Sequence, residues 1–527
     1  MSKLVDLNTL VALPKISRRE FIQTAVAAGT AATVAMSAWN KAQAATPRRG
    51  GKLRLGSSGG STTNSLDGAA LIDSHPVQTS WMIRNNLTEI TADGIAPELA
   101  ESWEASRDAK VWIFRLRQGV EFHNGKTLDA EDVIHSINYH RGPDTKSGGK
   151  GAVSGIEDVK ADGSTTVVFT LQSGNSDFPF LMADYHLPIV PAGTTGGDFN
   201  TGIGTGPYVL TAWEPGVRSA GKRNPNYFKE GRAWFDEVEN LNITDTTARQ
   251  NALQTNEVDA IESPSLKTLT LLAKLDGVTI HELGGTKHYT MPMRMDVDPF
   301  GSNDVRLALK YAIDREAMLA AILLGHGYLG NDHPIGKNQP FFASGLEQRT
   351  YDPDKAKFHL KQAGLSTVSV ALSAGEIYEG AVDSAVLFKE HAAKAGIDIE
   401  IVRESSDGYW SDVWNKKPFT LCFWDGRVTA DWMFSTAYES TASWNDTVWK
   451  NEQFDKTLAA ARVELDEAKR AQMYYELQQL VRDDGGVIVP MFANQIFATR
   501  DTIVTSPKIA ADRNLDGFRG AERWWSA

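Results

Sequence analysis

The sequence predicts an α/β protein with more than one domain. Its 527 residues exceed what one hydrophobic core usually organises, and about two to four domains are expected. Helix and strand signals alternate through residues 352–403, an order that indicates a mostly parallel sheet covered by helices. The composition, 42% hydrophobic and 23% charged, is typical of a globular protein.

Residues 1–45 predict a cleavable export signal. The paired arginines Arg18 and Arg19 precede a moderately apolar run over residues 25–38, and a small-residue cleavage site follows near Ala44. The motif SRREF is typical of a twin-arginine signal peptide. A transmembrane anchor is the alternative, but the run is rich in Ala, Gly and Thr and shorter than the ~20 apolar residues of a span. We therefore expect a soluble periplasmic protein that is exported in the folded state.

Charge, cysteine and histidine usage exclude several kinds of site. A net charge of −12 makes nucleic acid and anionic membranes poor partners. Because Cys422 is the only cysteine, there is no intrachain disulfide, no thiolate zinc site and no lipid attachment after the signal. The eleven histidines include no close ligand pair, so we predict no metal bound by the protein alone and no cofactor.

A strand over residues 52–56 opens the mature chain and leads into a loop of small residues. In this loop Gly56, Ser58 and Gly60 have the G-x-S-x-G spacing of a hydrolase nucleophile. That motif requires a sharp turn into a helix, and residues 61–68 do not begin one. A secreted serine hydrolase using Ser58 is therefore kept only as the alternative from another functional class.

Residues 87–133 carry the most consistent local signals. A turn at residues 93–97 is expected to lead into a short amphipathic helix, and the alternating VWIFRLR segment then predicts a strand. On that strand, Trp112, Phe114 and Leu116 share one face. A turn at residues 124–125 precedes a helix for which Asp129 is the expected N-cap.

In the order of these pieces, the stretch resembles the family 5 extracellular solute-binding proteins of ABC transporters, which bind peptides, nickel or opines. The residues that match the family pattern are Pro97, Leu99, Ala100, Trp103, Asp108, Trp112, Phe114, Leu116, Arg117, Gly119, Val120, Phe122, His123, Gly125, Asp132 and Val133. Further matches are GTGPY at residues 204–208, RNPNYF at residues 223–228 and the pattern over residues 299–314.

The resemblance implies a periplasmic-binding-protein-like fold, with two α/β domains joined by a hinge and an inserted lobe that enlarges the first domain. The implied boundaries are 46–88, 204–288 and 497–527 for domain I, 89–203 for the inserted lobe, and 289–496 for domain II. It further implies a monomer that binds a small-molecule or peptide ligand between its domains and delivers it to the permease of an ABC importer. No reaction is catalysed in such a protein.

The remaining elements follow from periodicity and capping residues. The expected helices cover residues 76–87, 248–259, 353–363, 377–394, 409–414 and 452–482, and the expected strands include residues 278–283, 368–373 and 397–403. Asp352 is the expected N-cap of the third of these helices, and Gly364 ends it.

Six of the fourteen tryptophans lie between residues 409 and 449, with charged residues among them. They are Trp410, Trp414, Trp424, Trp432, Trp444 and Trp449. An aromatic core is one interpretation, but a core tolerates charges poorly. Apolar walls with a few polar groups are typical of a cleft for a small ligand.

The segment FWDGRVTADWMF holds the candidate ligand-binding charges. In the peptide binders of the family, an aspartate here holds the ligand's ammonium group and a basic residue elsewhere holds its carboxylate. Trp424 matches the family tryptophan, which implies Asp425 for the ammonium group, and Arg427 is the candidate for the carboxylate. An Asp425–Arg427 salt bridge that only shapes the loop is the alternative. The aromatic neighbours expected to line the ligand are Trp410, Trp432, Tyr438 and Trp444.

Two further candidates come from other parts of the chain. Arg294 lies on a strand whose alternate methionines look buried, so its guanidinium either reaches solvent or binds an anion. In the resembling family, the loop that contains Ser58 borders the ligand cleft. Because Phe423 replaces the family glycine and Asp431–Trp432 replaces Asp-Pro, the ligand stays open among peptide, opine, oligosaccharide and metal chelate.

Overall fold

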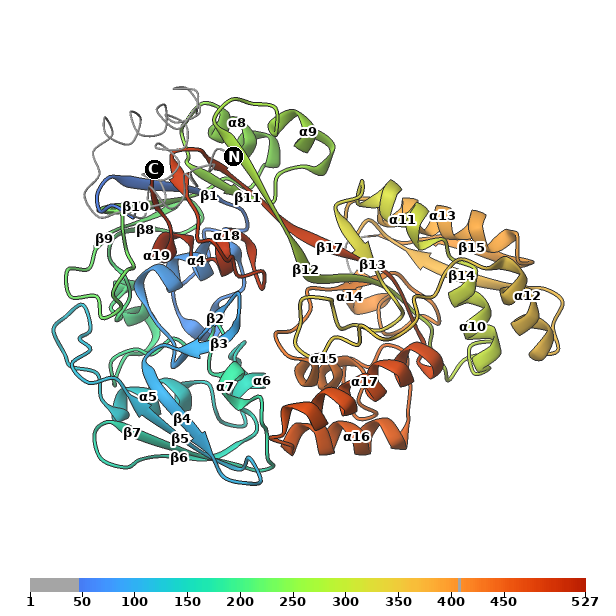
Figure 1. Cartoon of the computed structure of the whole chain (residues 1–527), viewed down its shortest axis with the longest axis horizontal. Helices are drawn as coiled ribbons and strands as arrows, with labels where there is room; N and C mark the ends of the chain where they lie inside the picture. Colours follow the sequence, from blue (N-terminus) through green and yellow to red (C-terminus); the bar gives the residue numbers. More distant parts are fainter. Residues whose placement is uncertain (1–46, 406–408) are drawn as a thin grey trace, which may run out of the picture.

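The computed structural model describes residues 47–405 and 409–527, so the predicted twin-arginine segment lies outside the described residues. The described part is a mixed α/β protein, as the sequence predicts. It forms two bodies, joined by two long strands that cross from one to the other (Figure 1). None of the described helices is long and apolar enough to cross a membrane.

A nine-stranded sheet runs through both bodies. Its order is β16-β12-β17-β11-β1-β10-β9-β8, and β13 also pairs with β17. The two crossing strands are β12 (Val278–Pro292) and β17 (Val487–Arg500), which are antiparallel neighbours along most of their length. Since both bodies share this pair of strands, any movement between the bodies must bend it.

The first body holds the end of the sheet nearer the chain termini. Its strands are β1 (Lys52–Ser57), β8 (Tyr208–Glu214), β9 (Arg218–Arg223), β10 (Glu237–Asn242) and β11 (Ala260–Glu262). Its helices are α4 (Ser74–Ile83), α8 (Thr246–Gln254), α9 (Leu269–Leu272), α18 (Asn514–Gly517) and α19 (Gly520–Arg523). β1 is parallel to β10 and β11, and its Leu53 is fully buried in a core that also contains Tyr208 and Trp524. Two short antiparallel pairs complete it: the hairpin of β2 (Thr88–Thr91) with β3 (Gly94–Pro97), and β18 (Ile503–Val504) with β19 (Trp525–Ser526).

A separate four-stranded antiparallel sheet extends the first body. Its order is β4 (Ala100–Ala105), β5 (Val111–Leu116), β7 (Thr166–Leu171) and β6 (Ile156–Ala161), and it carries helices α5 (Ala130–Tyr139), α6 (Lys150–Val153) and α7 (Phe178–Leu181). The alternation predicted for β5 is confirmed, because Trp112, Phe114 and Leu116 are buried and their neighbours are not. Asp129 forms the expected cap and makes a complete capping box with Asp132.

The prediction of a short helix after the turn at residues 93–97 is wrong. Residues 100–105 form strand β4, in which Trp103 lies opposite Phe114 of β5. The segment is too short for the spacing of its apolar residues to distinguish the period of a helix from that of a strand. Pairing with β5 makes it a strand.

The second body is built mainly from helices packed on short strands. Its elements are α10 (Asn303–Tyr311), α11 (Arg315–Ile322), β13 (Gly327–Leu329), α12 (Pro353–Gln362), β14 (Val368–Ala374), α13 (Ala381–Ala393), β15 (Ile397–Arg403), α14 (Tyr409–Asp412), β16 (Cys422–Trp424), α15 (Ala430–Ala437), α16 (Glu452–Val463) and α17 (Glu467–Asp484). β14 and β15 are parallel, as the strand–helix–strand order indicates. Asp352 caps α12 through the amide of Lys355.

The single helix expected over residues 452–482 is divided in two. Glu464 has extended backbone angles, and Asp466 accepts a hydrogen bond from the Lys469 amide to begin α17. A new N-cap within an amphipathic pattern ends one helix and begins another. The domain boundaries given above stay predictions.

Candidate functional site

The candidate site lies at the end of β16, which pairs with the crossing strand β12. Trp424 is opposite His288 in this pair, and the chain then turns at Gly426 with a positive φ of 76°. A Cβ at Gly426 would lie 2.5 Å from the Cβ of Thr286, so only glycine fits. Thr429 caps α15 immediately afterwards. The turn 425–427 is therefore held between a paired strand and a capped helix.

A cluster of aromatic rings borders this turn. Trp424 packs against Trp414 and Trp444 with centroid distances of 5.9 and 5.8 Å, and Trp410 packs 5.8 Å from Trp414. Trp424 is 7% exposed, whereas Trp410 and Trp444 are 44% and 46% exposed. Large exposed tryptophans on a rigid aromatic base are suited to contact a ligand. The structure thus brings together three of the predicted tryptophans.

Arg427 is stacked between two aromatic side chains. Its guanidinium carbon lies 5.9 Å from the ring centroid of Trp424 and 5.8 Å from that of Trp432. Its side chain donates a hydrogen bond to the carbonyl of Gly426 at 2.7 Å. Among the described residues it has no ion pair with a carboxylate. Burial lowers the pKa of Arg427, although the charge of Asp425 acts to raise it.

Asp425 has a different cationic neighbour from the one considered in the sequence. Its carboxylate lies 3.7 Å from the Nζ atom of Lys287 and is 76% exposed. Lys287 also lies 4.3 Å above the ring of Phe423. The alternative Asp425–Arg427 salt bridge is absent from the described contacts: Asp425 is exposed and pairs with Lys287, and Arg427 is half-buried between its two rings.

Three predicted site residues have other surroundings. Tyr438 is 4% exposed within the aromatic core of the second body. Arg294 donates two hydrogen bonds to Asp296, at 3.1 and 2.8 Å, and a third to the carbonyl of Asn415. The hydroxyl of Ser58 donates to Glu262 at 2.9 Å. Each of these side chains makes these contacts inside its own body, and a role in ligand binding stays a prediction for all three.

Two residues near the turn were missed in the sequence. Lys287 follows a Gly-Gly-Thr segment with no local charge pattern, and only the pairing of β12 with β16 brings it to Asp425. Asp446 accepts a hydrogen bond from the Trp414 indole at 2.9 Å and is 6% exposed. Burial raises the pKa of Asp446 to about 7. The acid lies between Trp444 and Trp449, inside the tryptophan-rich segment, but no local pattern distinguishes it from the other polar residues there.

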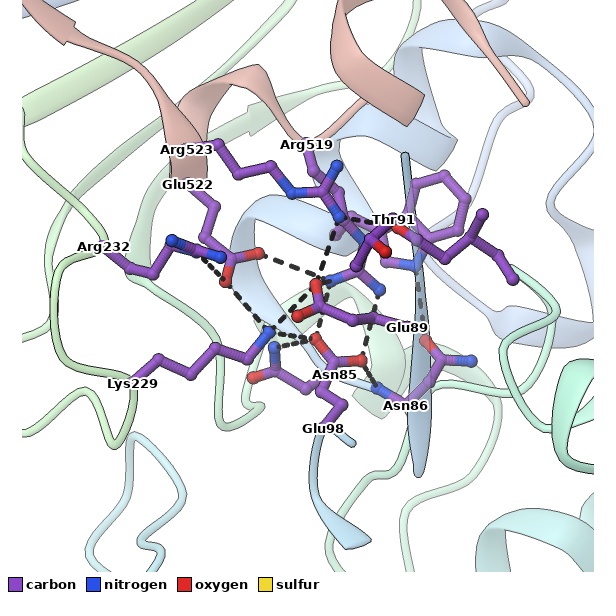
Figure 2. Close-up of polar contacts among 12 residues, drawn as sticks. Asn85, Asn86, Glu89, Thr91, Glu98, Lys229, Arg232, Arg519, Glu522 and Arg523 are labelled. Atoms are coloured by element: carbon purple, nitrogen blue, oxygen red, sulfur yellow. Dashed lines mark hydrogen bonds and ion pairs between the residues drawn. The ribbon is translucent and has the colours of Figure 1, made fainter. Parts of the chain in front are cut away.

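The one group of carboxylates in the described residues that is close enough for a metal lies elsewhere. Glu89, Glu98 and Glu522 meet in the first body, all buried (Figure 2). Lys229 contacts all three, at 3.2, 2.7 and 3.0 Å, and Arg519 lies 2.6 Å from Glu98. Because these cations already neutralise the carboxylates, the cluster fits a structural ionic network and not a metal site.

Comparison with known proteins gives a consistent result. The profile of bacterial extracellular solute-binding proteins, family 5, matches residues 94–468. The dipeptide-binding protein of Escherichia coli K12 is 26% identical over 450 residues, covering 78% of this chain and 84% of that protein.

Solved structures show the same fold. The periplasmic binding protein DppA of Helicobacter pylori in complex with the peptide STSA has a TM-score of 0.73 at 21% identity and covers 91% of this chain and 98% of its own. AgaA from A. tumefaciens R10 in complex with agropinic acid has a TM-score of 0.71 at 24% identity and covers 90% of this chain and 99% of its own. The periplasmic-binding-protein-like fold expected from the sequence is confirmed.

Proposed function

The chain belongs to the bacterial extracellular solute-binding proteins of family 5, and from this we propose that it captures a small peptide or amino-acid-derived solute for an ABC importer. The ligand binds between the two bodies, against the exposed tryptophans of the second. No bond in the ligand is made or broken. The permease at the inner membrane receives the ligand from the closed, periplasmic form.

The observation that carries this proposal is the turn 425–427. It presents one accessible carboxylate and one guanidinium without a carboxylate partner, two residues apart, beside Trp424 and Trp444. Asp425 accepts from an ammonium group, and Arg427 donates to a carboxylate. A molecule that carries both groups, with an apolar or planar part between them, matches this arrangement.

An opine is the second candidate ligand. It is favoured by Lys287, which lies beside Asp425 and adds a second cation to the site. An amino-acid derivative with more than one carboxylate would satisfy both Lys287 and Arg427. The relative AgaA, whose structure contains agropinic acid, has the same fold.

The serine hydrolase alternative has little support. Ser58 donates to Glu262 through both its amide and its hydroxyl, and Glu262 is 1% exposed. A nucleophilic serine needs a general base such as histidine within hydrogen-bond reach. Among the described contacts of the Ser58 side chain there is no histidine.

A thermal-shift screen followed by calorimetric titration tests the proposal. Dipeptides, tripeptides, opines, sugars and nickel chelates are compared, and we expect a peptide or opine to raise Tm. Asp425→Asn and Trp444→Ala should each weaken that ligand about tenfold or more, because they remove a charge-assisted hydrogen bond and an exposed aromatic contact.

The matched controls are Asp354→Asn and Phe358→Ala, which alter an exposed acid and an exposed aromatic of α12. These two control variants should bind the ligand with an affinity within about twofold of that of wild type. If Asp425→Asn and Trp444→Ala bind the ligand as tightly as the controls do, the site is placed wrongly.

A further inference from the structure

The backbone of the turn 425–427 is held by side chains from two other segments. The carbonyl of Asp425 accepts a hydrogen bond from the Thr286 hydroxyl of β12 at 3.0 Å. The carbonyl of Arg427 accepts a hydrogen bond from Nε2 of Gln339 at 2.6 Å. One end of the turn is therefore attached to a crossing strand, and the other end to the segment that follows β13.

Gln339 uses both ends of its side-chain amide. While Nε2 donates to the turn, Oε1 accepts from the backbone amide of Gly336 at 2.6 Å. The backbone amide of Gln339 also donates to the carbonyl of Gly336 at 2.9 Å, and the residue is only 7% exposed. Because withdrawing a buried amide leaves its partners unsatisfied, its orientation is fixed. The side chain is thus a bridge between Gly336 and Arg427.

The same part of the second body is attached to the two crossing strands. The Tyr328 hydroxyl donates to the carbonyl of Gly285 at 2.6 Å, and Nδ2 of Asn338 donates to the carbonyl of Gly284 at 2.7 Å. The ring of Tyr328 stacks on Phe492 of β17, with 4.9 Å between the centroids. Tyr328 belongs to β13, which pairs with β17 at the junction of the bodies (Figure 1). The segment after β13 is therefore fixed on the strands that join the bodies.

The carbonyls that accept these bonds border an irregularity in β12. The register of β12 against β17 shifts between Gly284 and His288, so residues 285–287 bulge out of the ladder. A bulge bends its strand and changes the direction of its side chains. Thr286 and Lys287, which both contact the turn, lie in this bulge. Bulge and turn are thus connected by two routes, directly through Thr286 and through the segment after β13.

We propose that Gln339 is a positioning residue for the ligand site. This rests on the proposed function and deepens it, because Gln339 acts on the ligand only through the turn 425–427. By holding the Arg427 carbonyl, it keeps that end of the turn in the conformation in which the guanidinium is stacked between Trp424 and Trp432. Without the bridge, the turn must be ordered when the ligand binds, and this ordering lowers affinity.

The first test removes the bridge at nearly constant side-chain size. The dipeptide Ala-Phe, the tripeptide Ala-Ala-Phe and agropinic acid are titrated by calorimetry into wild type and Gln339→Met. We expect the probe that binds wild type to bind Gln339→Met about fivefold or more weakly, which is the effect of losing about one net hydrogen bond. The loss should lie mainly in a faster dissociation rate.

Gln250→Met is the matched control, because Gln250 is a buried glutamine of α8 in the first body, 6% exposed. Its Oε1 accepts from the Ser265 amide at 3.1 Å, and its Nε2 donates to the Thr268 hydroxyl at 2.9 Å. The control therefore loses the same kinds of hydrogen bond away from the turn. It should lower stability about as much as Gln339→Met and leave the affinity within about twofold of wild type.

Gln339→Glu supplies a rescue that depends on pH. At neutral pH its carboxylate still accepts from Gly336 but does not donate to the Arg427 carbonyl, so affinity should fall as in Gln339→Met. The protonated acid has nearly the shape of the amide and can donate again. The ratio of wild-type to variant affinity should therefore shrink from about fivefold at pH 7 to within about twofold near pH 4. A ratio that does not change with pH would contradict the positioning role.

Hydrogen exchange tests the bridge in the protein alone. In Gln339→Met, the peptides that cover residues 422–433 should exchange about fivefold faster than in wild type, because the turn opens more often. In Gln250→Met, exchange over these residues should stay at the wild-type rate.

Failure of the positioning role and failure of the proposed function give different results. If Gln339→Met equals Gln250→Met in affinity and exchange while Asp425→Asn weakens binding, Gln339 does not position the site and the proposed function stands. If none of the three probes binds but residues 422–433 exchange faster in Gln339→Met, the bridge to the turn stands and the proposed ligand class is wrong.

Discussion

Asp446 is a carboxylic acid placed beneath the tryptophan cluster. It accepts from Trp414 and lacks an ion pair among the described residues. Burial raises the pKa of Asp446 to about 7, compared with about 4 for an exposed aspartate. At neutral pH the native state therefore holds a partly protonated acid under the tryptophan cluster, and its titration contributes to the pH dependence of stability.

Stability should fall with rising pH through Asp446. A group whose pKa is raised in the native state stabilises it fully below the pKa of the unfolded chain and loses that contribution as pH rises through the native value. For Asp446 the window runs from about pH 4 to about pH 7. Between pH 5 and 8, the unfolding free energy of wild type should fall by about 3 kcal/mol relative to Asp446→Asn.

Denaturant unfolding at several pH values checks this expectation. The comparison with Asp446→Asn cancels other groups that titrate in this range, such as Asp431, whose pKa burial raises to about 6. Asp412→Asn, an exposed acid of α14, is the control and should track wild type. Parallel curves for Asp446→Asn and wild type would contradict the assignment.

At the scale of elements, β16 and its turn position the site. β16 contributes only three residues to the sheet, yet they pair with β12 and bring Lys287 to Asp425. The turn depends on Gly426, which both adopts a positive φ and approaches Thr286 closely. The contact with Thr286 links the site to the strand that joins the two bodies.

Replacing Gly426 by alanine should displace the turn. Gly426 and Gly364 have the same φ of 76°, but a Cβ at Gly364 meets nothing within 4 Å. Gly426→Ala and Gly364→Ala therefore share the backbone strain of about 1 kcal/mol, and only Gly426→Ala adds a clash with Thr286. We expect Gly426→Ala to lose a further 1–3 kcal/mol or so of stability and about tenfold in ligand affinity. Equal losses in the two variants, by chemical unfolding and titration, would show that the approach to Thr286 does not position the site.

At the scale of the whole molecule, the part of the first body that carries the four-stranded sheet touches the second body directly. Asp177, before α7, forms an ion pair with Arg470 of α17 at 2.5 Å. The amide and hydroxyl of Ser176 donate to the carbonyl of Arg462 at 2.7 and 2.8 Å. Arg462 also contacts Asp431 of α15, the helix that carries Trp432. The interbody contact is therefore connected to the candidate site through helix α15.

Breaking this contact should favour separation of the bodies. Asp177→Asn removes a buried charge pair, since Asp177 is 3% and Arg470 10% exposed. Without ligand, we expect a larger radius of gyration in small-angle scattering. We also expect ligand affinity to fall about tenfold, because the closed form is less stable relative to the open form once this contact is lost. Asp162→Asn, in the exposed turn between β6 and β7, serves as the control. An unchanged radius and affinity would show that the contact does not govern closure.

Many elements were predictable because their signals are local. The alternation of β5, the Asp129 and Asp352 caps and the positive-φ glycine at Gly364 depend on residues a few positions apart, and the structure contains each of them. Local signals failed where a segment of the sequence is compatible with two kinds of secondary structure. Residues 100–105 became a strand through pairing with β5, and residues 464–466 interrupted a helix that periodicity alone would have continued.

The sequence by itself determined the family, the α/β class and the tryptophan-rich segment that carries Trp424, Asp425 and Arg427, because these rest on ordered motifs and on composition. Only the tertiary structure decided which charges are free. It paired Arg294 with Asp296 and placed Lys287 beside Asp425. The physical reason is that the availability of a charge depends on its neighbours in space, and those neighbours come from strands and bodies far apart in the chain.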